Sequence, residues 1–116
     1  MLAKSMSEPD GSALDKLYDT IASRRGGDPA QSYSARLLEG GTPLIAKKLG
    51  EETTETIIEA VKGDRARLAA ESADLLYHLL ALWVAAGVTP AEIWRVLEAR
   101  AGTSGLAEKA ARGKKG

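Results

Sequence analysis

The sequence contains no cysteine among its 116 residues. This absence excludes a disulfide framework, a thiolate nucleophile and any zinc or iron–sulfur centre with cysteine ligands. The composition is compatible with a reducing cytoplasm, and we expect a cytoplasmic protein. The chain also has a single histidine, which is too few for a di-iron carboxylate bundle built on two Glu-x-x-His pairs.

The sequence has no excess of charge of either sign and no long apolar run. Sixteen basic and sixteen acidic residues give a formal net charge of zero, so we expect no broad electrostatic attraction to nucleic acid or to an anionic membrane. The longest apolar stretch, residues 75–86, is interrupted by His78 and is shorter than the roughly 20 residues that a membrane-spanning helix needs. We therefore expect a soluble protein without a nucleic-acid or membrane partner.

Strand signals are missing too, because no segment alternates polar and apolar residues with a period of two. Helical periodicity, capping residues and Gly or Pro breaks predict an all-α helical bundle of about four to five helices. The expected helices cover residues 12–24, 31–38, 43–62, 65–86 and 90–100. The expected capping residues are Ser12, Thr42, Asp64 and Thr89. The expected domains are a flexible leader at 1–11, a helical domain at 12–101 and a polar tail at 102–116.

The segment 75–84 carries apolar side chains on nearly every side of its helix, so one neighbouring helix cannot cover it. A chain with about four helices has little material to surround one of them. We therefore expect a homodimer or a higher homo-oligomer, with a monomeric bundle as the alternative. His78 lies among these apolar residues and is expected to be a core residue, hydrogen-bonded through one nitrogen, rather than a metal ligand.

Carboxylates gather on two of the expected helices. Glu51, Glu52 and Glu55 form an E-E-x-x-E motif, and Glu71 and Asp74 form E-x-x-D on the next helix. Spacings of three and four residues make these acids surface neighbours that repel each other. A short turn between the helices favours antiparallel packing, which would let the carboxylates converge on one point. All-oxygen ligation suits Mg²⁺, with Mn²⁺ as the alternative ion; a merely solvated acidic face is the competing interpretation.

Two lysines precede the acidic motif by one turn, and their role has two interpretations. Lys47 and Lys48 lie four residues before Glu51 and Glu52, so they could form ordinary helical ion pairs worth a few tenths of a kcal/mol. Alternatively, they could bind phosphate oxygens of a substrate that the metal also binds. Arg36 is a further candidate for a phosphate-binding cation.

Several motifs in the chain resemble those of the phosphoribosyl-ATP pyrophosphohydrolases of histidine biosynthesis, which belong to the all-α, MazG-like nucleotide pyrophosphohydrolases. The resemblance spans about residues 14–112. The motifs are Tyr33-Ser34-Ala35-Arg36-Leu37, Gly40-Gly41, Ile45-Ala46-Lys47-Lys48-Leu49-Gly50-Glu51-Glu52-x-x-Glu55, Glu71-x-x-Asp74-Leu75-Leu76-Tyr77-His78, and Ser104-Gly105-Leu106-Ala107-Glu108-Lys109 with Arg112.

The resemblance implies Mg²⁺-dependent hydrolysis of phosphoribosyl-ATP to phosphoribosyl-AMP and pyrophosphate, the second step of histidine biosynthesis. The implied metal ligands are Glu52, Glu55, Glu71 and Asp74. The implied catalytic residues are Glu51, Glu52 and Glu55, with Glu51 either a further ligand or a base outside the ligand set. The implied substrate-binding residues are Tyr33, Ser34, Arg36, Lys47 and Lys48.

The chemistry of a triphosphate substrate agrees with this implication. Several carboxylates would repel a triphosphate unless cations lay between them, and a metal-bound water could attack phosphorus without a covalent intermediate. Two other functions remain open from the residues alone. One is a housecleaning pyrophosphatase of the MazG or dUTPase-like group that acts on nucleoside triphosphates, and the other is a non-catalytic helical oligomerisation module.

Overall fold

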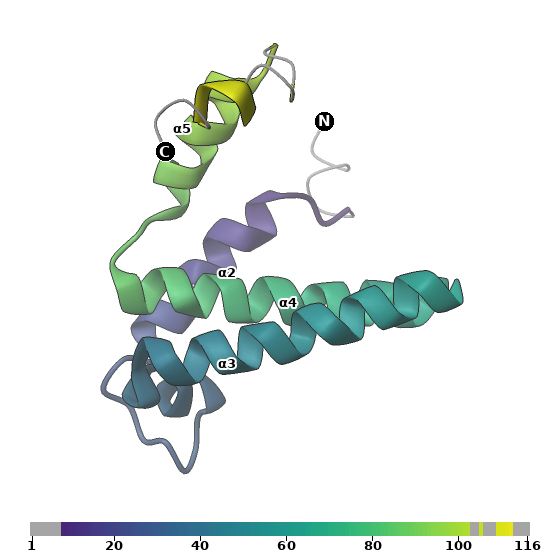
Figure 1. Ribbon diagram of the computed structural model, residues 1–116. Coiled ribbons are helices and arrows are strands. Elements are labelled where there is room, and N and C mark those ends of the chain that lie inside the picture. Colours follow the sequence, from purple (N-terminus) through teal and green to yellow (C-terminus); the bar gives the residue numbers. More distant parts are fainter. Residues whose placement is uncertain (1–7, 103–104, 106–108, 113–116) are drawn as a thin grey trace.

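The computed structural model describes residues 8–102, 105 and 109–112. All regular structure in these residues is helical (Figure 1), which confirms the all-α prediction. The leader residues 1–7 and the tail residues 103–104, 106–108 and 113–116 lie outside the described part. The helices are α2 (Ser12–Ser23), α3 (Tyr33–Lys62), α4 (Arg65–Ala86) and α5 (Pro90–Arg100).

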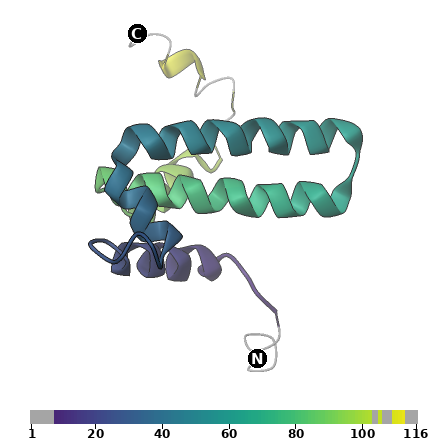
Figure 2. The ribbon, with the colours of Figure 1, turned by 90° about the horizontal axis from the view of Figure 1, so that it is seen from below.

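A long antiparallel hairpin of α3 and α4 is the main feature of the fold (Figure 2). Its closed end is a tight turn at Gly63, which has the left-handed backbone φ of 79° that favours glycine. Asp64 then caps α4, because its side chain accepts a hydrogen bond from the Arg67 amide at 3.0 Å. The turn confirms the antiparallel pairing predicted from the sequence.

Helix α3 is bent into two limbs. Gly41 has φ 78° and ψ −178°, a conformation that is essentially restricted to glycine. Pro43 follows, where the helix restarts and a missing amide hydrogen costs little. The first limb begins at Tyr33 with Ser32 as its cap, two residues later than predicted, because the amides of residues 31 and 32 bond the Asp28 carbonyl instead.

The predicted cap of the first helix is wrong. Ser12 lies inside α2, and Gly11 occupies the capping position without a side-chain bond. Asp10 takes over the capping role, since its Oδ1 accepts hydrogen bonds from the Ser12 amide at 2.9 Å and the Ser12 hydroxyl at 2.6 Å. These bonds lower the pKa of Asp10. At the other end of the chain, Thr89 forms the predicted capping box of α5.

The core lies at the open end of the hairpin, where α2 and the first limb of α3 pack against the second half of α4. Its fully buried large side chains are Ile21, Leu37, Ile45 and Leu80. Arg25 and Tyr18 tie this end of the hairpin to the preceding segments. They donate hydrogen bonds to backbone carbonyls near the end of α4, at 2.8 and 2.9 Å. The core thus fixes the base of the hairpin.

The outer half of the hairpin is much less covered. Within the described residues, α4 is the one helix that is long and apolar enough, by length and composition alone, to cross a membrane, although a core helix of a soluble protein meets the same criteria. Only 22% of its most apolar stretch is buried within the chain. Large apolar side chains are also exposed on α3, namely Ile57, Ile58 and Val61. Exposed apolar surfaces of this kind are typical of sites where a protein binds a partner.

Candidate metal centre

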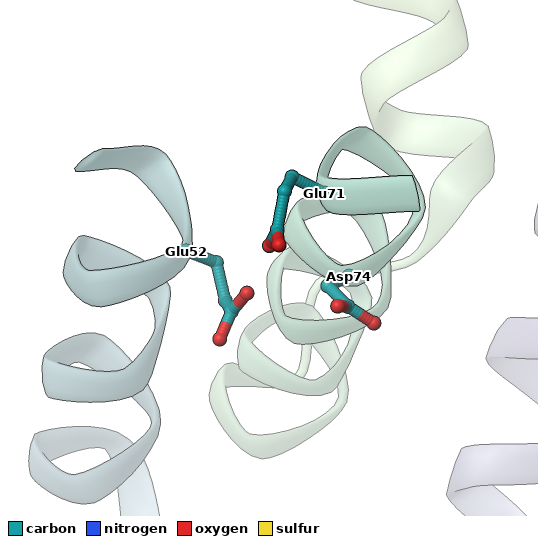
Figure 3. Close-up of side chains that lie close together, drawn as sticks. All are labelled: Glu52, Glu71 and Asp74. Carbon is teal, nitrogen blue, oxygen red and sulfur yellow. The ribbon is translucent and has the colours of Figure 1, made fainter. Parts of the chain in front are cut away.

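Three carboxylates converge midway along the hairpin (Figure 3). Glu52 comes from α3, and Glu71 and Asp74 come from α4. One oxygen from each lies within 4.8 Å of the other two. The i,i+3 spacing places Glu71 and Asp74 on one side of α4, and the antiparallel register brings Glu52 opposite them. The structure therefore confirms the predicted convergence for these three acids.

The carboxylate cluster is partly buried and strongly acidic. Glu52 and Glu71 are half-buried, whereas Asp74 is exposed. Partial burial raises the pKa of Glu71, and the carboxylates of Glu52, Asp74 and Glu55 raise it further. Both causes disfavour the charged form of Glu71. A cation between the carboxylates would remove this penalty.

The donor set fits Mg²⁺, the ion implied by the resemblance. All three side chains offer hard oxygen ligands, which Mg²⁺ prefers. Oxygens bound to one Mg²⁺ lie at most about 4.2 Å apart, so carboxylates within 4.8 Å of each other need only small side-chain adjustments. Three protein ligands would also leave positions for water and substrate phosphate.

Two other acids of the predicted site lie outside this group. Glu55 is exposed and is not among the three converging side chains, although its charge contributes to the raised pKa of Glu71. Glu51 is exposed and its Oε1 lies 3.8 Å from Lys48 Nζ. This i,i+3 pair replaces the predicted i,i+4 pair between Lys48 and Glu52. Lys47 is exposed on the same helix.

Tyr33 and His78 connect the first limb of α3 to α4 beside the acids. His78 Nδ1 lies 2.8 Å from the Asp74 carbonyl, which can only accept, so this nitrogen carries the proton. In a neutral imidazole, Nε2 then accepts from the Tyr33 hydroxyl at 3.0 Å. His78 is buried, as predicted, but it is hydrogen-bonded through both nitrogens rather than one.

The neighbouring hydroxyl groups and Arg36 complete this side of the site. The Ser34 and Tyr77 hydroxyls are hydrogen-bonded to each other, and the Tyr77 ring stacks on Tyr33 with centroids 6.0 Å apart. Desolvation, followed by the nearby Tyr77, Glu52 and Glu51, raises the pKa of Tyr33 and keeps its phenol protonated. Arg36 instead donates to the Pro29 carbonyl at 3.3 Å, so its guanidinium faces the preceding loop.

Two further groups lie on the line of the candidate metal ligands; sequence reasoning missed Thr56, and it noted Glu59 one turn beyond the acidic motif but gave it no role. Thr56, one turn after Glu52, donates towards a carbonyl of each helix. Glu59, a further turn along, is buried with its Oε2 3.6 Å from Arg67 Nε and its Oε1 3.9 Å from Lys62 Nζ. The seven-residue spacing of Glu59 from Glu52 was a usable signal, because it repeats the same helix face.

The raised pKa of Glu71 predicts how the metal-free protein responds to pH. The Glu71 carboxyl group binds its proton more tightly in the folded chain than in the unfolded chain, where its pKa has the ordinary value of 4.5. The folded protein therefore loses stability as the pH rises from 4.5 through the raised pKa of the folded state, because Glu71 ionises. Without metal, Glu71→Gln should therefore be the more stable protein at pH 7, and its advantage should shrink towards pH 4.5. The thermal unfolding midpoints of the wild type and of Glu71→Gln, measured in metal-free protein from pH 4.5 to pH 7, test this prediction. A difference between the two midpoints that does not vary with pH would contradict it.

Comparison with known proteins identifies the family. The sequence matches the phosphoribosyl-ATP pyrophosphohydrolase family over residues 14–101. The chain belongs to this family. It is 59% identical over 99 residues to a phosphoribosyl-ATP pyrophosphatase of Azospirillum brasilense, covering 85% of this chain and 89% of the relative. It is 58% identical over 101 residues to that of Gluconobacter oxydans, covering 87% and 76%, and 58% identical over 100 residues to that of Cereibacter sphaeroides, covering 86% and 97%.

The matched region contains the whole hairpin and every candidate site residue on it. The family match ends at residue 101, before the tail motif from Ser104 to Arg112. Ser104 and residues 106–108 of that motif lie outside the described residues; residues 105 and 109–112 are helical and exposed.

Proposed function

We propose that this chain hydrolyses phosphoribosyl-ATP to phosphoribosyl-AMP and pyrophosphate, the second step of histidine biosynthesis. The observation that carries the proposal is that the family match includes the three carboxylates that the hairpin brings within 4.8 Å of one another. The relatives named above carry the name phosphoribosyl-ATP pyrophosphatase.

In the proposed reaction, the carboxylates of Glu52, Glu71 and Asp74 would hold Mg²⁺. Bound there, the ion would supply positive charge to the substrate phosphates and lower the pKa of a water molecule. Glu55, whose charge acts on Glu71, would be the further ligand that the family resemblance implies. Glu51, which pairs with Lys48 at the edge of the cluster, orients the attacking water and accepts its proton.

Residues of both limbs of α3 bind the substrate in this proposal. Exposed Lys47 and half-buried Lys48 supply positive charge towards the phosphates that lie against the acids. Tyr33 and Ser34 present hydroxyl groups beside the cluster, and the bond to His78 fixes the Tyr33 ring. Arg36 reaches the substrate only if it releases the Pro29 carbonyl.

Turnover of purified protein tests the proposal. With Mg²⁺, phosphoribosyl-ATP should yield phosphoribosyl-AMP and pyrophosphate, EDTA should stop the reaction, and added Mg²⁺ or Mn²⁺ should restore it. A panel of canonical and noncanonical nucleoside triphosphates serves as the comparison. A higher kcat/KM for a plain nucleoside triphosphate would overturn the assignment in favour of a housecleaning pyrophosphatase.

We further propose that a second copy of the chain covers the exposed apolar surface and makes a homo-oligomer. Val61, Ile57 and Ile58 are 82%, 57% and 42% exposed in the single chain, and an exposed apolar patch of this kind favours an interface. Sedimentation velocity should give at least a dimer for the wild type; a monomer at micromolar concentration would refute this.

The proposed location is the cytoplasm, where the enzyme is soluble. Glu71 and Asp74 lie within α4, and two carboxylates inside a membrane would be costly. The zero net charge of the chain gives no support to a nucleic-acid partner. The proposed partners are therefore its small-molecule substrate and its own copies.

A further inference from the structure

One side chain touches the backbones of both helices at the level of the carboxylate cluster. The Thr56 hydroxyl lies 2.7 Å from the Glu52 carbonyl, on its own helix, and 3.2 Å from the Glu71 carbonyl, across the hairpin. A hydroxyl has one proton, which these two acceptors share in a three-centre hydrogen bond. The two residues that accept the bond are the same residues whose carboxylates converge.

The cluster needs such a connection because its charges oppose its own geometry. Glu52, Glu71 and Asp74 repel one another before a cation binds, and this repulsion contributes to the raised pKa of Glu71. The fully buried core residues Ile45 and Leu80 lie towards the base of the hairpin, so the fully buried core does not extend to the level of the acids.

Apart from the contact between the Glu52 and Glu71 carboxyl groups themselves, the other polar contacts between α3 and α4 lie further away along the chain. In the described part of the hairpin they are the Tyr33–His78 and Ser34–Tyr77 bonds from the first limb and the Glu59–Arg67 ion pair near the closed end. Thr56 is placed between these two groups. Half-buried and β-branched, it has little rotamer freedom to lose when it makes the bond.

We infer that Thr56 is a positioning residue, whose hydroxyl holds Glu52 and Glu71 at the spacing that binds the metal. This inference rests on the proposed function, because it takes the carboxylate cluster to be a metal centre. In this role Thr56 acts through Glu52 and Glu71, because its hydroxyl proton is shared by their two carbonyl oxygens. It reduces the reorganisation needed for binding by keeping the two helices in register while the site is empty of a cation.

The test compares Thr56→Val, which keeps the shape but removes the hydroxyl, with Thr56→Ser, which keeps the hydroxyl. Thr53→Val is the matched control, because the Thr53 hydroxyl is exposed and bonds only the Leu49 carbonyl of its own helix, at 2.8 Å. Mg²⁺ affinity is measured by calorimetric titration without substrate. Hydrogen exchange over residues 71–75 is measured in metal-free protein.

Thr56→Val should bind Mg²⁺ about 5- to 10-fold more weakly, as expected for the loss of one hydrogen bond. Its metal-free exchange over residues 71–75 should be faster, while Thr56→Ser and Thr53→Val should behave like the wild type. Thr56→Val with a lower thermal midpoint but unchanged Mg²⁺ affinity would overturn the inference, since the role would then be structural only. A wild type that binds no Mg²⁺ would overturn the proposed metal centre and this inference together, whereas normal binding by wild type and Thr56→Val alike would overturn the inference alone.

Discussion

Asp74→Asn and Glu52→Gln are each expected to lower turnover of phosphoribosyl-ATP by about 100-fold or more, because altering even the partners of metal ligands costs 10- to 100-fold. Each change removes one negative charge from the cluster of three carboxylates and replaces a strong oxygen ligand with a weak one. Mg²⁺ affinity should fall as well. Steady-state kinetics over a range of Mg²⁺ concentrations measures both effects.

Asp19→Asn is the control for this loss. It makes the same chemical change on the exposed surface of α2 and should leave kcat/KM and Mg²⁺ affinity unchanged. Circular dichroism should show all three variants to be helical, because neither Glu52 nor Asp74 lies in the core. If Asp74→Asn and Glu52→Gln both retained metal-dependent turnover, the assigned centre would be wrong.

Leu80→Ala is expected to reduce the free energy of unfolding by about 2–5 kcal/mol, the range for removing a buried leucine side chain. Leu80 is 0% exposed and packs in the cluster where α2 and both limbs of α3 meet α4. Natural domains have only about 5–15 kcal/mol of total stability. A single cavity at this point should therefore remove a large part of it.

Urea denaturation followed by circular dichroism measures this change. Leu97→Ala provides a matched control, because Leu97 on α5 is 55% exposed and should lose less than about 1 kcal/mol. Equal destabilisation by the two substitutions would show that the base of the hairpin is not the main core. It would also indicate that Leu97 is buried against another copy of the chain.

The sequence predicted the helical elements well because their end signals are local. Gly63 and Asp64 mark the closed end of the hairpin, and Thr89 with Glu92 marks the start of α5. A short turn leaves two neighbouring helices little choice but antiparallel packing. The meeting of Glu52 with Glu71 follows from that pairing, so this part of the site was predictable without coordinates.

What could not be predicted depends on competition between equivalent side chains. Asp10 and Ser12 are both good caps, and only their positions relative to the first helical turn decide that Asp10 makes the bond. Lys48 can reach an acid three or four residues ahead, and it pairs with Glu51 rather than Glu52. Rotamers of exposed side chains differ by too little energy for the sequence to rank them.

Contacts between helices were the other unpredictable class. Thr56 reads as an ordinary helical residue, because its bond to the Glu52 carbonyl is the usual one for a threonine in a helix. Its approach to the Glu71 carbonyl depends on the rotation of α3 about its axis. The same holds for the Tyr33–His78 bond, which requires the bend in α3 as well as the pairing with α4.

That bend at Gly41 has an evolutionary consequence. The two limbs of α3 meet at an angle (Figure 2), and Gly41 alone forms the bend. The first limb carries the hydroxyl groups that start at Tyr33, and the second carries Glu52. Because the backbone conformation at the bend is essentially closed to every other amino acid, we expect any substitution of Gly41 to be costly even though Gly41 itself contributes no chemistry. We also expect an insertion or deletion within either limb to be costly, because it would move the hydroxyl groups relative to the acids.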